Sequence, residues 1–166
     1  MSPRSRHTPD KPTAVQRARA PGIPQRLLLA CGPLGPRLSA TTVASALTSG
    51  ICDAGRPGPD ICVLSVQSES SAEIRELLDE LDFDARMRHA RAVVIAAECL
   101  EERTLAGSVT FEIATRARQG GIPAYAVTGE DALSAFDARI LDLQVILQAR
   151  SRKALLTAGR KLAELS

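Results

Sequence analysis

The sequence predicts a doubly wound α/β fold, in which a mainly parallel sheet of about five strands has helices on both faces. Residues 27–31 and 92–97 are short, continuous apolar runs, which are typical of strands buried on both faces of a sheet. Amphipathic segments with an apolar residue every three or four positions alternate with such runs. This alternation indicates βα units, a parallel sheet and right-handed crossovers.

The same patterns place each strand and the turns between them. We expect strands at residues 27–31, 61–66, 92–97, 122–127 and 141–147. The first strand is followed by a loop with two glycines and two prolines, and the third by a loop over residues 98–103. Thr128-Gly129 is expected to turn the chain after the fourth strand.

The helices are placed by apolar spacing and by residues that cap helix ends. Ser39 suits the start of the first helix, and Ser70 or Ser71 the start of the second. Residues 82–91 are polar and are expected to be helical or turn-like. We expect further helices from near Thr104 to Gly120-Gly121, at residues 131–136 and at residues 151–165.

Composition and charge separate the chain into two parts. Residues 1–25 are rich in proline, arginine and serine, and we expect a disordered basic tail followed by a single domain at 26–166. The net charge is +2, of which residues 1–26 carry about +5, so the remainder is mildly acidic, at about −3. A basic binding face is therefore not predicted for the domain.

The chain has no apolar run long enough for a membrane span, and the basic start lacks the apolar core of a secretory signal. Its four cysteines form no C-x-x-C pair, and three lie in or beside apolar runs, as buried free thiols in a reducing compartment do. We therefore expect a bacterial, cytoplasmic protein. With only His7 and His89 in the chain, a zinc site and a Ser-His-Asp triad are not expected.

In open parallel sheets, ligands bind beyond the carboxyl ends of the strands, which directs attention to three loops. The first, residues 32–38, is glycine-rich and opens a helix, but it matches neither a P-loop nor a dinucleotide fingerprint. Pro33 and Pro36 also remove two amide donors, so we favour a βα turn over an anion site.

The second loop holds Glu98 and Glu101, whose carboxylates can bind Mg²⁺ or act as a general base. We favour a solvated loop that caps the helix starting near Thr104, and keep the catalytic interpretation open. The third loop, at residues 128–131, is weaker because a glycine after a strand mostly serves the turn. Candidates for substrate contact are Ser39, Thr104, Thr128 and Gly129.

A basic cluster surrounds His89, with Arg86, Arg88 and Arg91 close to it in sequence. It can bind phosphate or nucleic acid, but Asp82 and Asp84 lie nearby, so we favour a solvated helix face. Aromatic residues make up 2% of the chain, which argues against stacking on single-stranded nucleic acid.

Several segments resemble bacterial glycerate kinases in order and spacing. Residues 76–86 resemble their L-L-x-x-x-x-F-D-x-R stretch, and residues 92–108 their D-L-V-I-T-G-E-G-R-L-D-x-Q-T-L-x-G-K. Residues 114–127 resemble A-x-x-A-x-x-x-G-V-P-V-x-A-L, and residues 28–46 are similar to I-A-P-D-S-F-K-G-S-L-S-A-x-x-V-A-x-A. The family's chains are more than twice as long, with a second domain inserted between the parts that match here. The resemblance implies phosphorylation of glycerate with ATP and Mg²⁺.

The departures from the family pattern fall on its charged positions. The Asp and Lys of D-S-F-K fall on Gly32 and Gly35, the Arg of G-E-G-R on Cys99, and the Lys after T-L-x-G on Ser108. Glu98 takes the place of the family's Glu only after a shift of one position. The acidic motif A-D-G-G-E-G-T has no counterpart. Phosphoryl transfer depends on cations that neutralise developing charge, so we expect little or no kinase activity.

Three functions stay open from the sequence. We favour a degenerate glycerate kinase relative, a pseudoenzyme that requires no cofactor and binds a small anion or a partner chain. The second is an active small glycerate kinase that uses ATP, Mg²⁺, Glu98 and Glu101 and borrows groups from another subunit. The third is an unrelated flavodoxin-like binding domain. Loss of the inserted domain uncovers surface, so we expect a homo-oligomer or pairing with a full-length kinase. Membrane and nucleic-acid partners are not expected.

Overall fold

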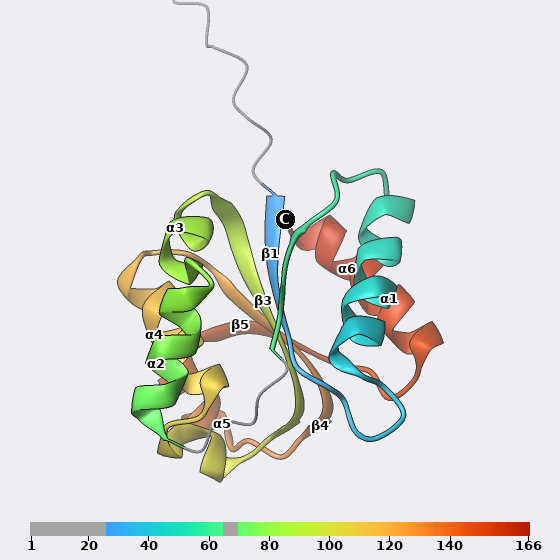
Figure 1. Cartoon of the computed structure of the whole chain (residues 1–166). Coiled ribbons are helices and arrows are strands. Elements are labelled where there is room, and N and C mark those ends of the chain that lie inside the picture. Colours follow the sequence, from blue (N-terminus) through green and yellow to red (C-terminus); the bar gives the residue numbers. More distant parts are fainter. Residues whose placement is uncertain (1–25, 65–69) are drawn as a thin grey trace, which may run out of the picture.

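The core of the protein is an all-parallel sheet of five strands. The computed structural model describes residues 26–64 and 70–166. The strands lie in the order β2-β1-β3-β4-β5, which is the flavodoxin-like order of doubly wound sheets, and the predicted fold class is confirmed (Figure 1). They are β1 (Arg26–Cys31), β2 (Asp60–Val63), β3 (Ala90–Leu100), β4 (Ala124–Asp131) and β5 (Leu143–Gln148).

Helices cover both faces of this sheet (Figure 1). One face carries α1 (Ala40–Asp53) and α6 (Arg152–Leu165), whose apolar residues pack on the odd-numbered side chains of β1. The opposite face carries a 3₁₀ turn, η1 (Glu102–Ala106), and four α-helices. These helices are α2 (Ser71–Glu80), α3 (Phe83–Arg88), α4 (Val109–Gln119) and α5 (Ala135–Leu141).

The apolar runs form the central strands because both faces of those strands are covered. Leu28, Leu29 and Ala30 of β1 have no exposed surface, and Val93 and Val94 of β3 have none either. Alternate residues enter two separate apolar clusters, one under α1 and α6 and one under α2 to α5. A continuous apolar run is therefore what a strand in this position requires.

Serine side chains cap five of the six α-helices. Ser39 accepts a hydrogen bond from the Thr42 amide, and Ser70 accepts one from the Glu73 amide, as the sequence predicts. Three further caps are made by Ser108, Ser134 and Ser151. Each serine satisfies an amide of the first turn that has no partner within its helix.

The structure corrects the chain path after β3 and β4. Both strands run further than predicted, and the Cys99 and Leu100 positions of β3 pair with Glu130 and Asp131 of β4. Glu98 and Thr128-Gly129 therefore lie in strands and not in a loop and a turn. The β4 extension has no apolar residue, and Glu98 interrupts the apolar run of β3 before Cys99 and Leu100, so neither extension continues the pattern. Each is held by the other across the sheet.

Two helix predictions and two strand starts are also wrong in their bounds. The segment from Thr104 to Gly120 is not one helix, since Gly107 takes a φ of +98° between η1 and α4. The short helix lies at Ala135–Leu141, after the Ser134 cap, and not at 131–136. The fifth strand accordingly begins at Leu143 and not at 141, and the fourth begins at Ala124 and not at 122. The predicted end of the second strand at residue 66 lies outside the described residues.

The cysteines are only partly as expected. Cys31 and Cys62 are buried, but Cys52 is exposed at the end of α1 and Cys99 is half-buried. Burial raises the pKa of the Cys31 thiol to about 12, so it is protonated at neutral pH. Among the helices that the structure describes, none has the length and apolar character needed to cross a membrane.

Helices α1 and α6 touch through two glycines. A Cβ atom on Gly50 would overlap the Leu156 carbonyl oxygen, and a Cβ atom on Gly159 would overlap the Leu47 carbonyl oxygen. Because each glycine has only a hydrogen atom as its side chain, the backbones of α1 and α6 can come into contact above the sheet. The crossing leaves no room for a side chain at either position.

A second tertiary link holds α3 to the edge strand β2. The Arg86 guanidinium donates to both carboxylate oxygens of Asp60, with an Nε–Oδ2 distance of 2.8 Å. It also donates to the carbonyl oxygens of Leu81 and Ile61. These bonds hold the pKa of Asp60 below its usual value of 3.8, against the opposing effect of burial.

We predict that Gly50→Ala lowers the free energy of unfolding by about 2 kcal/mol or more, because the added methyl group pushes α6 away from α1. Urea unfolding followed by circular dichroism measures the change. Gly58→Ala is the matched control, since the nearest atom to its Cβ is the Cys52 sulfur at 3.9 Å. Equal stability of the two variants would show that the helices are not packed as described.

We predict that Asp60→Asn costs about 1 kcal/mol at pH 7, a modest loss because the Asp60 side chain is 43% exposed and solvent screens the pair. Since the folded-state pKa of Asp60 is lowered, its contribution is complete above pH 3.8 and is lost as the pH falls through that lowered pKa. The difference between the variant and the parent protein should therefore shrink in urea unfolding at pH 3. Asp53→Asn, which breaks an exposed pair with Arg160, is the control. A difference that persists in acid would contradict the assignment.

Candidate functional site

The candidate site lies where the sheet changes winding direction. The chain leaves β1 toward β2 on one side, and β3 lies on the other side, so the connections that follow β1 and β3 diverge at their carboxyl ends. A pocket of about 300 Å³ opens there. Its lining comes from β1 and β3 ends, η1 and α4: Gly32, Pro33, Leu64, Ile95, Ala96, Ala97, Glu98, Cys99, Thr104, Ser108, Val109 and Thr110.

Among the residues that the structure describes, Glu98 is the one charged side chain in the lining of this pocket. It is exposed near the end of β3, and its Oε1 lies 3.5 Å from the point that a Cβ on Gly35 would occupy. Gly35 has a φ of +87°, so a glycine lets the loop after β1 pass close to the carboxylate. The Gly32 amide donates to the Ala96 carbonyl oxygen at 3.0 Å, which closes the floor of the pocket.

Glu101 does not share the pocket with Glu98. Its carboxylate pairs with Arg103 at 2.7 Å, and it is absent from the pocket lining. Its backbone amide donates to the Thr104 hydroxyl at 3.0 Å, so the residue starts the η1 turn. The two carboxylates that the sequence offers as a joint Mg²⁺ or base site thus have different surroundings.

The candidates for substrate contact have structural partners. Thr104 lines the pocket, but its hydroxyl already accepts from Glu101, and Ser39 caps α1 outside the lining. Thr128 is fully buried, and its hydroxyl donates to the Glu130 carbonyl oxygen at 2.9 Å. Gly129 packs so closely on β3 that a Cβ would lie 2.9 Å from the Glu98 carbonyl oxygen. Of the four, only Thr104 belongs to the pocket.

The sequence prediction missed the start of α4. Ser108 donates to the Thr104 carbonyl oxygen at 2.7 Å and accepts from the Phe111 amide at 3.1 Å. Val109 and Thr110 follow it in the pocket wall, where the first amides of an eleven-residue helix lie. A serine cap is a recognisable signal, but the continuous helix predicted from Thr104 concealed it.

The electrostatics of the pocket do not suit a nucleophile or a phosphate clamp. Its lining holds the Glu98 carboxylate and neither lysine nor arginine. Burial, then Glu101 and Glu130, raise the pKa of the Cys99 thiol, so it stays protonated at neutral pH. In the described part of the chain, no group of three or more His, Cys, Asp or Glu side chains could hold a metal ion. The arrangement can bind a small ligand through backbone amides and hydroxyls.

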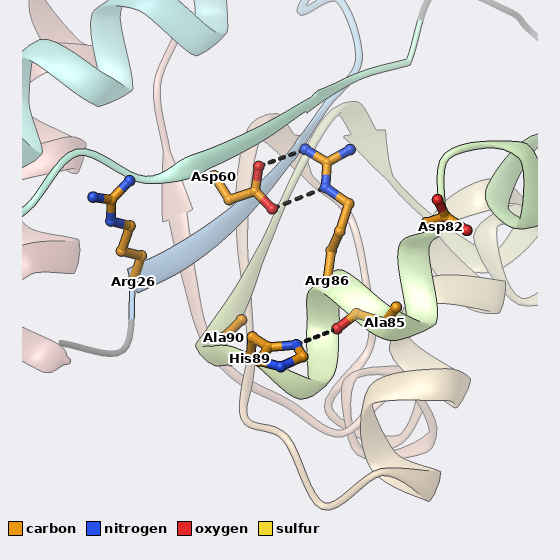
Figure 2. Close-up of a pocket in the computed structure, with 7 residues that line it drawn as sticks. All are labelled: Arg26, Asp60, Asp82, Ala85, Arg86, His89 and Ala90. Atoms are coloured by element: carbon orange, nitrogen blue, oxygen red, sulfur yellow. Dashed lines mark hydrogen bonds and ion pairs between the residues drawn. The ribbon is translucent and has the colours of Figure 1, made fainter. Parts of the chain in front are cut away.

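The basic cluster around His89 lies at the opposite, amino-terminal edge of the sheet. Arg88, His89 and Arg91 are exposed there, as expected for a solvated face. Arg86 is not part of that face, because it is held against Asp60. A pocket of about 740 Å³ opens beside this pair (Figure 2).

The fold and the pocket at the change of winding define an open, doubly wound α/β protein of the kind that binds ligands at its carboxyl edge. Residues 37–164 match the sequence model of the glycerate kinase family. The chain belongs to the glycerate kinase family. The match spans α1 to α6 and includes most of the pocket lining.

No curated protein matches the sequence. Among solved structures, the chain is similar to a diflavin flavoprotein A3 from Nostoc sp., with a TM-score of 0.43 and 18% sequence identity. That likeness covers 85% of this chain and 92% of the other. It is too distant to indicate a function.

We predict that Thr128→Val lowers the free energy of unfolding by about 1 to 2 kcal/mol, since the buried hydroxyl is lost while its partners stay in place. Urea unfolding measures the loss. Thr110→Val is a matched control: the side chain is also buried, and its hydroxyl has no hydrogen bond to another described residue. Equal losses in the two variants would indicate that the Thr128 hydroxyl does not hold β3 and β4 together.

Proposed function

We propose that this chain is a degenerate glycerate kinase relative with little or no ATP-dependent phosphorylation of glycerate. One observation carries the proposal: among the described residues, the pocket at the change of winding is lined by a carboxylate and by no cationic side chain. Phosphoryl transfer needs positioned cations to neutralise charge on the transferred group and the leaving oxygen. A lone exposed carboxylate adds negative charge where the reaction already accumulates it.

The substitutions relative to the family pattern support this proposal by their position. Gly32, Cys99 and Ser108 are the residues onto which the resemblance places an Asp, an Arg and a Lys of the family. All three line the pocket, on different elements. Gly35, onto which the resemblance places another Lys, is outside the lining but lies close to the Glu98 carboxylate, so the loss of charge is gathered in and beside one cavity. This is the pattern expected when catalysis has been lost and the fold has been kept.

We propose that the pocket retains a binding role for a small anion. The first amides of α4 have no partner inside the helix, and the Thr110 hydroxyl lies close to them, whereas the Ser108 hydroxyl is taken up by Thr104 and Phe111. A volume of about 300 Å³ suits a small ligand. No cofactor is required for this role, and ATP and Mg²⁺ belong to it only if the family activity survives.

The surroundings of Glu101 argue against the active alternative. An enzyme that used Glu98 and Glu101 together would need both carboxylates free to face the same substrate, and Glu101 is paired with Arg103. A second subunit would have to break this pair and also supply the missing cations. We also propose that the chain pairs with a second copy of itself or with a full-length kinase in the bacterial cytoplasm. In this proposal the pairing is a binding role and does not supply catalytic groups.

We predict that the purified protein releases no ADP in a coupled assay with ATP, Mg²⁺ and D-glycerate beyond the rate without glycerate. Circular dichroism on the same sample shows that the protein is folded. Glu98→Gln and Glu101→Gln are measured alongside and should leave this background rate unchanged. Glycerate-dependent turnover that Glu98→Gln abolishes would overturn the proposal and establish the small active kinase.

A further inference from the structure

The larger of the two pockets described above lies at the edge of the sheet opposite the proposed binding site. Its lining comes from the first residues of β1, β2 and β3 and from α3: Arg26, Asp60, Asp82, Ala85, Arg86, His89 and Ala90. Its volume of about 740 Å³ is in the range of pockets that bind small molecules. None of these residues lines the pocket at the carboxyl edge.

One wall of this pocket is a fixed ion pair. Figure 2 shows the Arg86 guanidinium directed at the Asp60 carboxylate, with two hydrogen bonds between them. Arg86 also donates to two backbone carbonyl oxygens, so its donors are largely occupied by the protein. Asp60 is neutralised by its partner and presents no net charge that would repel an anion.

Two other basic side chains keep free donors or acceptors. Arg26 lies on the other side of Asp60 from Arg86, and it makes no hydrogen bond or ion pair to a described residue (Figure 2). The Nδ1 atom of His89 donates to the Ala85 carbonyl oxygen at 2.8 Å, because a carbonyl can only accept. The Nε2 atom of that ring has no such partner among the described residues. Arg26 and His89 therefore have polar atoms to offer a ligand.

The charge on the Arg26 side of the pocket is positive. A smaller cavity of about 90 Å³ shares Arg26 and is lined also by Arg56 and Arg91, with no aspartate or glutamate. In these two linings Arg56 donates to the carbonyl oxygens of Ala163 and Ser166 and Arg86 is paired with Asp60, whereas Arg26 and Arg91 have no such partner among the described residues. Asp82 lies beyond Arg86, on the side away from Arg26 (Figure 2). An anionic group is thus favoured at the Arg26 end and opposed only at the far end.

We propose that this amino-edge pocket is a second binding site, which takes a small organic anion with its carboxylate or phosphate group on Arg26. The uncharged body of the ligand lies along the Ala85 and Ala90 side of the pocket, against the aliphatic part of Arg86. Arg26 supplies paired donors to two anionic oxygens, as a planar guanidinium does for either group. The site is independent of any activity at the carboxyl edge, since the sheet separates the two pockets.

Titration of the full-length protein with phenyl phosphate, benzoate and phenol tests the proposal. We expect binding of one or both anions, with amide NMR shifts at residues 26, 60 and 85–90, and no shifts with uncharged phenol. The comparison of phenyl phosphate with benzoate separates a phosphate site from a carboxylate site. Isothermal titration calorimetry gives the affinity of each probe.

Arg26→Gln should weaken anion binding at least tenfold, because Arg26 carries the charge and the paired donors that the anion meets. Arg37→Gln is the matched control: it makes the same change of charge in the loop after β1, outside both pockets. An affinity that Arg26→Gln and Arg37→Gln lower equally would overturn the proposal, as would shifts confined to residues 96–110. The proposal also fails if neither anion binds at about 10 mM, the weakest range expected of a specific contact. Each result stands apart from the kinase assay, which does not involve Arg26.

Discussion

The parallel pairing of β1 with β3 determines where both pockets of this protein lie. The register aligns Arg26 with Ala90 at one end and Cys31 with Ala96 at the other. Because parallel strands share their direction, the residues that precede both strands meet at one edge and those that follow meet at the opposite edge. The connection from β2 crosses β1 to reach β3, so the chain also diverges from this pair at the carboxyl edge.

The two edges differ in chemistry although the same two strands create them. At the carboxyl edge, Glu98 faces a glycine loop and the start of a helix, with no cationic side chain in the lining. At the amino edge, arginines surround a fixed ion pair. Ligands of doubly wound proteins bind at the carboxyl edge, and it is there that we propose the charges for phosphoryl transfer to be missing. The amino-edge pocket, for which we propose anion binding, therefore lies at the edge of the sheet opposite the one that the family and the fold indicate.

The packing of α1 on α6 supports the pairing of β1 with β3 from one face of the sheet. Gly50 and Gly159 allow the two helices to touch, and the cluster beneath them includes Leu29 and Val94 of the central strands. On the other face, Arg86 fixes α3 to β2, the strand at the edge of the sheet. The position of the amino-edge pocket therefore depends on a polar contact, whereas that of the carboxyl-edge pocket depends on backbone pairing and a helix cap.

The sequence by itself determined the fold class, all five strands to within two residues at the amino end of each, and the first two helix caps. It could do so because continuous apolar runs, helical spacing and capping serines are local signals of burial and of unpaired amides. The family also followed from the sequence, since the order of its motifs survives the loss of their charged residues. The sequence further indicated that Glu98 stands near a strand end, in the region where the carboxyl-edge pocket lies.

Only the tertiary structure decided which of those residues meet. The polar ends of β3 and β4 are strands because each is the other's partner, and no pattern within either segment records that pairing. Glu98 and Glu101 are three residues apart, yet one lines the pocket and the other pairs with Arg103, because β3 ends between them and Glu101 caps the η1 turn that follows. Asp60 lies 26 residues before Arg86 in the chain, yet its ion pair with Arg86 forms one wall of the amino-edge pocket. Side chains distant in sequence acquire a shared environment only when the sheet register brings their strands together.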